Sequence, residues 1–185
     1  MAASPAPRAL VVIDVQAGFD DPSWGPANNP QLEVNVARLV EAWRARSLPM
    51  VFVRHDSAEE GSVLAPGTAG NRLKVVGEPD LLVTKRVHSA FYGQPDLDRW
   101  LQERGISRLA ICGIATDHCC ETTARMAGDL GYDTELVLDA TRTFDRRGPD
   151  GTTIPADEVA RRTAASLHDE FCQVVDTDQL LAELE

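Results

Sequence analysis

Uninterrupted apolar runs alternate along the chain with segments of helical periodicity. The run at 9–15 lacks the polar alternation of a half-exposed strand, so it predicts a strand that is covered on both faces. The next segment, 29–46, repeats apolar residues at helical spacing and carries Pro30 in its predicted first turn. Further strands are predicted at 49–55, 80–86, 107–114, 133–140 and 172–177, and further helices at 95–105, 117–131 and 156–170.

This order predicts an α/β fold, a three-layer α/β/α domain with a six-stranded parallel sheet, doubly wound in the Rossmann-like manner. No repeat, low-complexity tract or linker divides the chain. We expect a disordered leader at 1–8 and one domain at 9–185. The segment 56–79 has little periodicity and exceeds the usual length of a connection, so it is interpreted as a lid or a functional loop.

Composition and charge narrow the class of partner. The 185 residues are 43% hydrophobic and 25% charged, which suits a globular domain with a sizeable core. A net charge of −11, spread along the chain, argues against nucleic acid or a membrane as partner. The beginning of the chain lacks a signal-peptide pattern, and the run at 9–15 is too short to span a bilayer. We therefore expect a cytoplasmic protein that acts on a small molecule.

The four cysteines do not form a pattern typical of a disulfide framework or a zinc site. Cys112, Cys119, Cys120 and Cys172 include no CxxC pair, and no cluster of spaced metal ligands accompanies them. The stretch DVQAGFDD after the first strand also lacks the GxGxxG fingerprint of a dinucleotide-binding module. We expect neither a metal nor a cofactor.

Three unlike reactive side chains follow predicted strand ends. Asp14 ends the first strand, Lys85 ends the third, and GIATDHCC follows the fourth. Sites of open parallel sheets gather at this edge. A cysteine in the first turn of a helix, near a lysine, is expected to have a low pKa. An aspartate could take its proton and return it to a leaving amine, while backbone N–H groups receive an oxyanion. Periodicity alone does not choose between Cys119 and Cys120.

Three motifs make the chain similar to a known family over almost its whole length. VVIDVQAGF, TKRVHSAFYGQPDLD and ICGIATDHCCETTARMAGDLGY resemble motifs of the isochorismatase-like cysteine hydrolase superfamily, in its metal-independent amidohydrolase branch. The resemblance implies a catalytic triad of Asp14, Lys85 and Cys119, with Cys120 in the core. It also implies a cis peptide at Ile114–Ala115 and an oxyanion hole formed by the N–H groups of Ala115 and Cys119.

The implied reaction is hydrolysis of an amide, carbamoyl or lactam C–N bond of a small molecule through a thioester, with Lys85 holding the thiolate and Asp14 charged. Related proteins often form dimers or tetramers, so we expect a homo-oligomer. The segment VRHDSAEEGSVL lacks the further histidine of the zinc site of nicotinamidases. Cys119 counts against the vinyl-ether cleavage of true isochorismatases. A non-catalytic binding protein on the same fold is the alternative, which the intact triad disfavours.

Aromatic and histidine side chains near the strand ends are candidates for a substrate pocket. We predict that Phe19, Trp24, Tyr92 and His118 bind substrate, although the direction of the His118 side chain stays open. Phe91 is interpreted as a packing residue. His88 and His168 are interpreted as surface or packing histidines.

Overall fold

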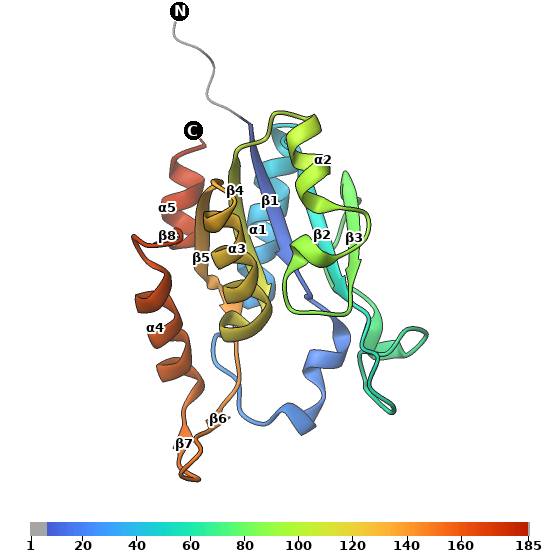
Figure 1. Cartoon of the computed structure of the whole chain (residues 1–185), viewed down its shortest axis with the longest axis vertical. Helices are drawn as coiled ribbons and strands as arrows, with labels where there is room; N and C mark the ends of the chain where they lie inside the picture. Colours follow the sequence, from blue (N-terminus) through green and yellow to red (C-terminus); the bar gives the residue numbers. More distant parts are fainter. Residues whose placement is uncertain (1–6, 185) are drawn as a thin grey trace, which may run out of the picture.

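The computed structural model describes residues 7–184, and its centre is a parallel sheet with strand order β3-β2-β1-β4-β5-β8 (Figure 1). The predicted fold class is therefore confirmed. The strands are β1 (Arg8–Ile13), β2 (Met50–His55), β3 (Leu81–Lys85), β4 (Arg108–Ile114), β5 (Asp133–Arg142) and β8 (Gln173–Val175).

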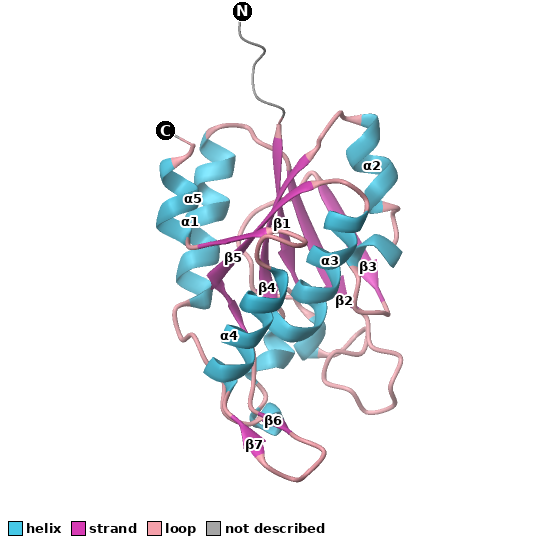
Figure 2. Cartoon of the chain, turned by 60° about the vertical axis from the view of Figure 1, so that its left-hand side comes forward, coloured by secondary structure: helices cyan, strands magenta, loops and turns pink. Residues whose placement is uncertain are grey.

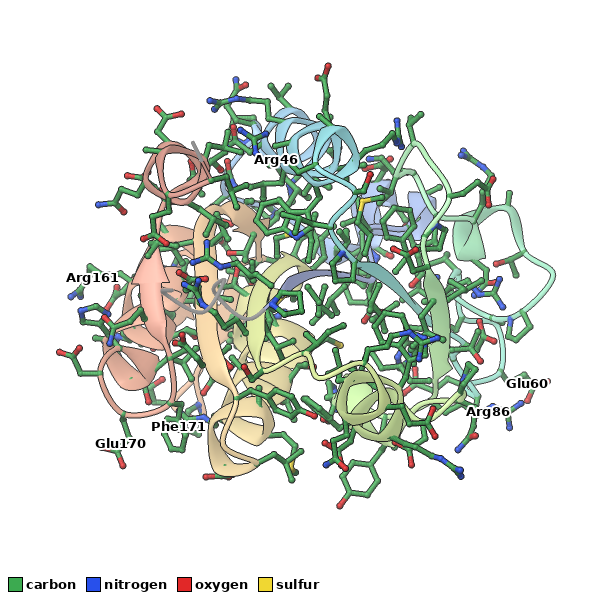
Figure 3. The ribbon with its side chains drawn as sticks, turned by 90° about the horizontal axis from the view of Figure 1, so that it is seen from above. Arg46, Glu60, Arg86, Arg161, Glu170 and Phe171 are labelled. Carbon is green, nitrogen blue, oxygen red and sulfur yellow. The ribbon has the colours of Figure 1, made fainter. Side chains whose placement is uncertain are left out.

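Helices cover both faces of the sheet (Figure 2). They are α1 (Leu32–Ala45), α2 (Leu97–Glu103), α3 (Glu121–Asp129), α4 (Ala156–Leu167) and α5 (Thr177–Ala182). Side chains fill both layers between the helices and the sheet when the molecule is viewed from above (Figure 3). In the described part of the chain, no helix is both long enough and apolar enough to span a membrane.

The central strand β1 explains the uninterrupted apolar run near the start of the chain. Successive side chains of a strand point to opposite faces. Val11 and Ile13 thus join the core under α2, α3 and α4, while Leu10 and Val12 join the core under α1 and α5. All six residues of β1 are buried, so neither face of the strand carries a polar stripe.

Four features differ from the sequence prediction. Arg8, assigned to the leader, is the first residue of β1 and is buried, whereas residues 1–6 lie outside the described part of the chain. A β-hairpin of β6 (Arg146–Arg147) and β7 (Thr153–Ile154) follows β5, and α5 follows β8. The third predicted helix, 117–131, begins with a π-helical turn, Thr116–Cys120, before α3.

The segment 56–79 is fixed to the carboxyl end of the sheet by two buried amides. The Gln16 side chain donates to the carbonyl groups of His55 and Asn71, at 3.0 Å each. The Asn71 amide donates to the carbonyl groups of His55 and Leu64, at 3.0 and 2.9 Å. Buried amides with their hydrogen bonds satisfied hold a loop in one conformation. Leu64 and Asn71 of this segment are therefore packed beside the strand ends, whereas most of its other residues are exposed or half-buried.

Glycine is required where β4 meets β1. Gly113 is the register partner of Ile13 and has a φ of +129°. A Cβ atom at this position would lie 1.9 Å from the Ile13 carbonyl oxygen. The missing side chain lets the end of β4 approach the end of β1, which brings the turn after β4 close to Asp14.

Glu33 ties α1 to β5 and to the segment 56–79. Its carboxylate accepts two hydrogen bonds from Arg142 and one from Lys74. Burial favours the neutral carboxyl group, but the bonds from Arg142 and Lys74 outweigh it and lower the pKa of Glu33 to about 2. Because the folded-state pKa is depressed, this contribution to stability is present above pH 4.5 and is lost as the pH falls towards 2.

We expect Glu33→Gln to lower the free energy of unfolding by about 1–2 kcal/mol at pH 7, since the side chain is 34% exposed and solvent weakens its ion pairs. Urea unfolding at pH 7 and near pH 2 measures the effect. At the lower pH, the variant and the parent protein are expected to have the same stability. An equal deficit at both pH values would contradict the ionic origin of the effect.

Candidate active site

The ends of β1, β3 and β4 bring the three predicted catalytic side chains together. Asp14 follows β1 with a φ of +51°, so the chain turns out of the sheet at this residue. Lys85 is the last residue of β3, and Cys119 lies in the π-helical turn after β4. The Lys85 ammonium lies 2.6 Å from Asp14 Oδ2 and 3.3 Å from Cys119 Sγ. The structure thus assembles the cluster that the sequence predicts.

A fourth residue, His55, completes the surroundings of the ammonium. His55 Nδ1 lies 3.3 Å from Lys85 Nζ. Within residues 7–184, Asp14, His55 and Cys119 are the one group whose ligand atoms could hold a metal ion, all within 4.8 Å of one another. Lys85 Nζ contacts all three residues. The cation held by these acceptors is therefore the lysine ammonium.

The charges of the cluster differ from the sequence prediction at Cys119. Burial works against a charged Lys85, but Asp14 and Cys119 outweigh it and raise the pKa of the ammonium. Burial and the Asp14 carboxylate raise the pKa of the Cys119 thiol more than Lys85 lowers it. The expectation of a low pKa for this cysteine is wrong, because the thiol is buried and has an anion as well as a cation beside it. The resting cluster is a neutral thiol next to a Lys85–Asp14 ion pair.

We expect the free protein to be alkylated slowly at Cys119. At pH 7, iodoacetamide should label this thiol more slowly than a free cysteine, whose pKa is about 8.5. Peptide mapping after timed labelling measures the rate, and labelling in urea supplies the unfolded reference. Labelling at pH 6 that is faster than that of a free cysteine would restore the thiolate interpretation.

A cavity of about 90 Å³ opens beside Cys119. Its lining combines aromatic, histidine and aliphatic side chains with the turn that carries the cysteine. The lining residues are Phe19, Trp24, His55, Leu64, His88, Ala115, His118, Cys119, Phe144 and Arg146.

Three of the four predicted pocket residues line this cavity. Phe19 and Trp24 lie with ring centroids 4.9 Å apart, and His118 lies in the turn that carries Cys119. Tyr92 does not contribute: it is 71% exposed and lies outside the cavity lining. The short helix Ala90–Tyr92 turns Phe91 inward onto Tyr132, which leaves Tyr92 in solvent. Tyr92 instead borders a second hollow together with Lys85, so its role in substrate binding stays a prediction. The interpretation of Phe91 as a packing residue agrees with the structure.

Sequence reasoning missed five lining residues. His55 ends β2, so the rule that placed Asp14 and Lys85 at strand ends applies to it as well. His88, interpreted as a surface or packing residue, lies edge-on to His118 with the ring centroids 5.4 Å apart. Leu64 and Phe144 lie in loops and Arg146 begins the short strand β6, and hydrophobic periodicity places none of them at the site.

The cavity carries little net charge. Arg146 donates to both oxygens of Asp117, at 2.7 and 3.0 Å, and the Thr143 hydroxyl group donates to the same carboxylate. Burial opposes ionisation of Asp117, but the bonds from Arg146 and Thr143 lower its pKa. Burial also lowers the pKa of His118. At neutral pH the wall thus presents a compensated ion pair and the neutral imidazoles of His55 and His118.

The turn after β4 contributes Ala115, His118 and Cys119 to the cavity lining. The Ile114–Ala115 peptide is cis, as the resemblance implies. The Ala115 carbonyl group accepts the N–H groups of His118 and Cys120, at 3.1 Å each. The Ala115 N–H has no acceptor among residues 7–184, which leaves it available to a ligand next to Cys119.

Comparison with known proteins identifies the family. A family model for the isochorismatase domain matches residues 8–176. The chain belongs to the isochorismatase family. A relative in this family, the uncharacterised protein YrdC of Bacillus subtilis, is 37% identical, and the match covers 94% of each chain.

Two further comparisons place this isochorismatase-family hydrolase among its relatives. Nicotinamidase 3 of Arabidopsis thaliana is 29% identical over 95% of this chain and 88% of its own. The crystal structure of an isochorismatase-family hydrolase from Chromobacterium violaceum superposes with a TM-score of 0.92. Its identity is 40%, and the match covers 98% of this chain and 95% of that one.

Proposed function

We propose that this isochorismatase-family hydrolase cleaves the C–N bond of a small neutral amide through a thioester on Cys119. The observation that carries the proposal is the Lys85 ammonium that bridges Asp14 and Cys119 at the edge of the cavity. A nucleophile, a proton acceptor and a fixed cation lie within one hydrogen-bonded cluster, as covalent acyl transfer requires.

In the proposed first half of the reaction, Cys119 Sγ attacks the amide carbonyl carbon as the thiol proton passes to Asp14. Asp14 Oδ1 is buried and has no hydrogen-bond partner among the described residues, so it is free to receive this proton. The carbonyl oxygen becomes an oxyanion that accepts the N–H groups of Ala115 and Cys119. The intermediate then collapses, Asp14 returns the proton to the nitrogen, and ammonia or an amine leaves.

In the second half, water attacks the thioester. Asp14 takes a proton from the water, the new tetrahedral intermediate expels Cys119 Sγ, and the proton returns to the sulfur. The products are a carboxylic acid and the original enzyme. Lys85 stays protonated throughout and stabilises whichever of Asp14 and Cys119 carries the negative charge.

The size of the cavity limits the acyl part of the substrate. An engineered apolar cavity of about 150 Å³ holds benzene. The cavity beside Cys119 measures about 90 Å³ and has aromatic walls in Phe19, Trp24 and Phe144. The acyl group inside it should thus be smaller than a benzene ring. A compact aliphatic amide fits this description, and the neutral lining disfavours a charged one.

A panel of primary amides tests the proposal through release of ammonia. Acetamide, propionamide and isobutyramide should be hydrolysed with a kcat/KM at least about tenfold above that for benzamide or nicotinamide. Phe144→Ala should enlarge the cavity and so reduce the difference in kcat/KM between the aliphatic and the aromatic amides. Nicotinamide as the best substrate would favour the activity named for the A. thaliana relative. If no amide is hydrolysed and no acyl group is found on Cys119, a non-catalytic binding protein is the better interpretation.

A further inference from the structure

We propose that His55 is a positioning residue, whose neutral ring holds the Lys85 ammonium in the orientation that serves both Asp14 and Cys119. The inference rests on the proposed function, because it assigns a role within the same site. The proposed reaction uses three side chains of the cluster, Cys119, Asp14 and Lys85. It gives no role to the fourth polar side chain, His55.

The fold places His55 beside Lys85 and fixes its backbone. The two residues are register partners in the parallel pair of β2 and β3, so their side chains leave the same face of the sheet. The His55 N–H donates to Gln16 Oε1 at 2.9 Å. The His55 carbonyl group accepts the side-chain amides of Gln16 and Asn71, at 3.0 Å each. Three hydrogen bonds with two buried side-chain amides, one donated by His55 and two accepted by it, thus hold this strand end in place.

The contact with Lys85 determines the tautomer of His55. An ammonium group has three N–H donors and no acceptor, so the imidazole nitrogen 3.3 Å from it must carry a lone pair. Nδ1 is therefore unprotonated and Nε2 carries the hydrogen. The Nε2–H meets no acceptor among residues 7–184, and the ring lines the cavity.

The third acceptor matters because the Lys85 side chain is completely buried. Its three N–H bonds meet three acceptors: Asp14 Oδ2, Cys119 Sγ and His55 Nδ1. Without the histidine, one N–H of this buried ammonium would lose its protein acceptor. The ammonium would then rotate to improve its remaining bonds, and Asp14 and Cys119 would lose their common donor. An unpaired buried donor costs enough to change a rate about 10- to 100-fold.

Protonation of His55 should break the same contact. A protonated ring offers no lone pair to Lys85 and places a second cation beside it. Burial and the Lys85 charge lower the pKa of His55 below its ordinary value of 6.5, against the opposing effect of Asp14. His88 also lowers this pKa, and Asp56 raises it. The ring thus stays neutral at pH 7, and the loss of activity through His55 should lie below pH 6.5.

Two isosteric substitutions separate this role from a direct contact with substrate. In His55→Asn, the amide oxygen takes the place of Nδ1, whereas in His55→Gln the amide nitrogen takes the place of Nε2. We expect kcat to fall about 10- to 100-fold in His55→Gln with KM changed less than about threefold. The kcat of His55→Asn should be at least about tenfold higher than that of His55→Gln. Its fall on the acid side of the pH profile should also lie at lower pH than in the parent protein. His168→Gln, on an exposed histidine outside the cavity, is the matched control and should keep the parent kinetics.

The opposite order, with His55→Gln active and His55→Asn impaired, would overturn the proposal in favour of a substrate contact through Nε2–H. Equal loss in both variants would overturn it as well. Nitrogen-15 NMR of histidine-labelled parent protein gives a second measurement that needs no variant to fold. It should show the Nε2–H tautomer at His55 at pH 7, and the Nδ1–H tautomer would overturn the proposal. The NMR result does not require turnover, so a failure of the amide hydrolase proposal is distinguishable from a failure of this one.

Discussion

Amide hydrolysis is expected to fall by about 10⁴-fold or more in Cys119→Ala, because this change removes the atom that forms the thioester. The neighbouring Cys120→Ala supplies a matched control. Cys120 is completely buried in the core that contains Ala124 and Ala127, and it does not line the cavity. Its loss should cost about 1 kcal/mol of stability and change kcat less than about threefold.

Initial rates on the best amide of the panel, together with urea unfolding of both variants, measure these effects. Mass spectrometry of protein quenched during turnover should find the acyl group on the peptide that carries Cys119, and this adduct should be absent in Cys119→Ala. Equal activity in the two variants would rule out Cys119 as the nucleophile. Loss of activity in Cys120→Ala with retention in Cys119→Ala would exchange the roles of the two cysteines.

The second large effect is expected for Lys85→Met, which should both inactivate and destabilise the protein. The Lys85–Asp14 ion pair is completely buried, with 0% exposure of both side chains. Removing one partner of such a pair leaves an uncompensated buried charge and lowers the free energy of unfolding by about 3–5 kcal/mol. We expect kcat to fall at least about 100-fold, because the bridging cation is lost.

The double variant Asp14→Asn/Lys85→Met separates stability from activity. It removes both charges, so it should recover at least about half of the lost stability while it stays inactive. Lys74→Met is the comparison on the surface, where the ammonium pairs with Asp20 and Glu33 and the side chain is 22% exposed. That change should cost only about 1 kcal/mol. If Lys85→Met were as stable as Lys74→Met, the charges of the buried cluster would have to be reassigned.

The sheet, Asp14 and Lys85 were predictable for one physical reason, whereas the choice of Cys119 over Cys120 depended on the family resemblance. A fully buried parallel strand has no polar face, so each strand reads as an apolar run, and the first polar residue after the run marks the carboxyl edge. Asp14 was found in this way, and Lys85 was found at the end of β3. His55 obeys the same rule, and its partnership with Lys85 follows from the register of β2 and β3.

The cavity wall was harder to predict because tertiary contacts, rather than periodicity, place it. Tyr92 and Phe91 are adjacent aromatic residues in one short helix, and only the position of Tyr132 determines which of them turns inward. Phe144 and Arg146 follow the unexpectedly long β5. The direction of the Cys119 pKa shift depends on burial and on the distance to Asp14, neither of which the sequence contains.

Helix α5 was missed because it is short, with only two adjacent leucines to mark an apolar face. Its start nevertheless carries a local signal. Asp176 and Gln179 form a capping box, in which each side chain accepts the backbone N–H of the other residue. A search for caps as well as for periodicity would have found this helix.

The acceptors around Lys85 come from distant parts of the chain. Asp14 is 71 residues from Lys85 in sequence, Cys119 is 34 and His55 is 30. No two of these residues can meet through local structure, and four strands must pair before the ammonium has all its partners. Catalytic competence is thus a late event in the folding of this protein, and a partly folded chain already rich in helix would be catalytically silent. Regained turnover during refolding would therefore report the closure of the sheet from β3 to β4.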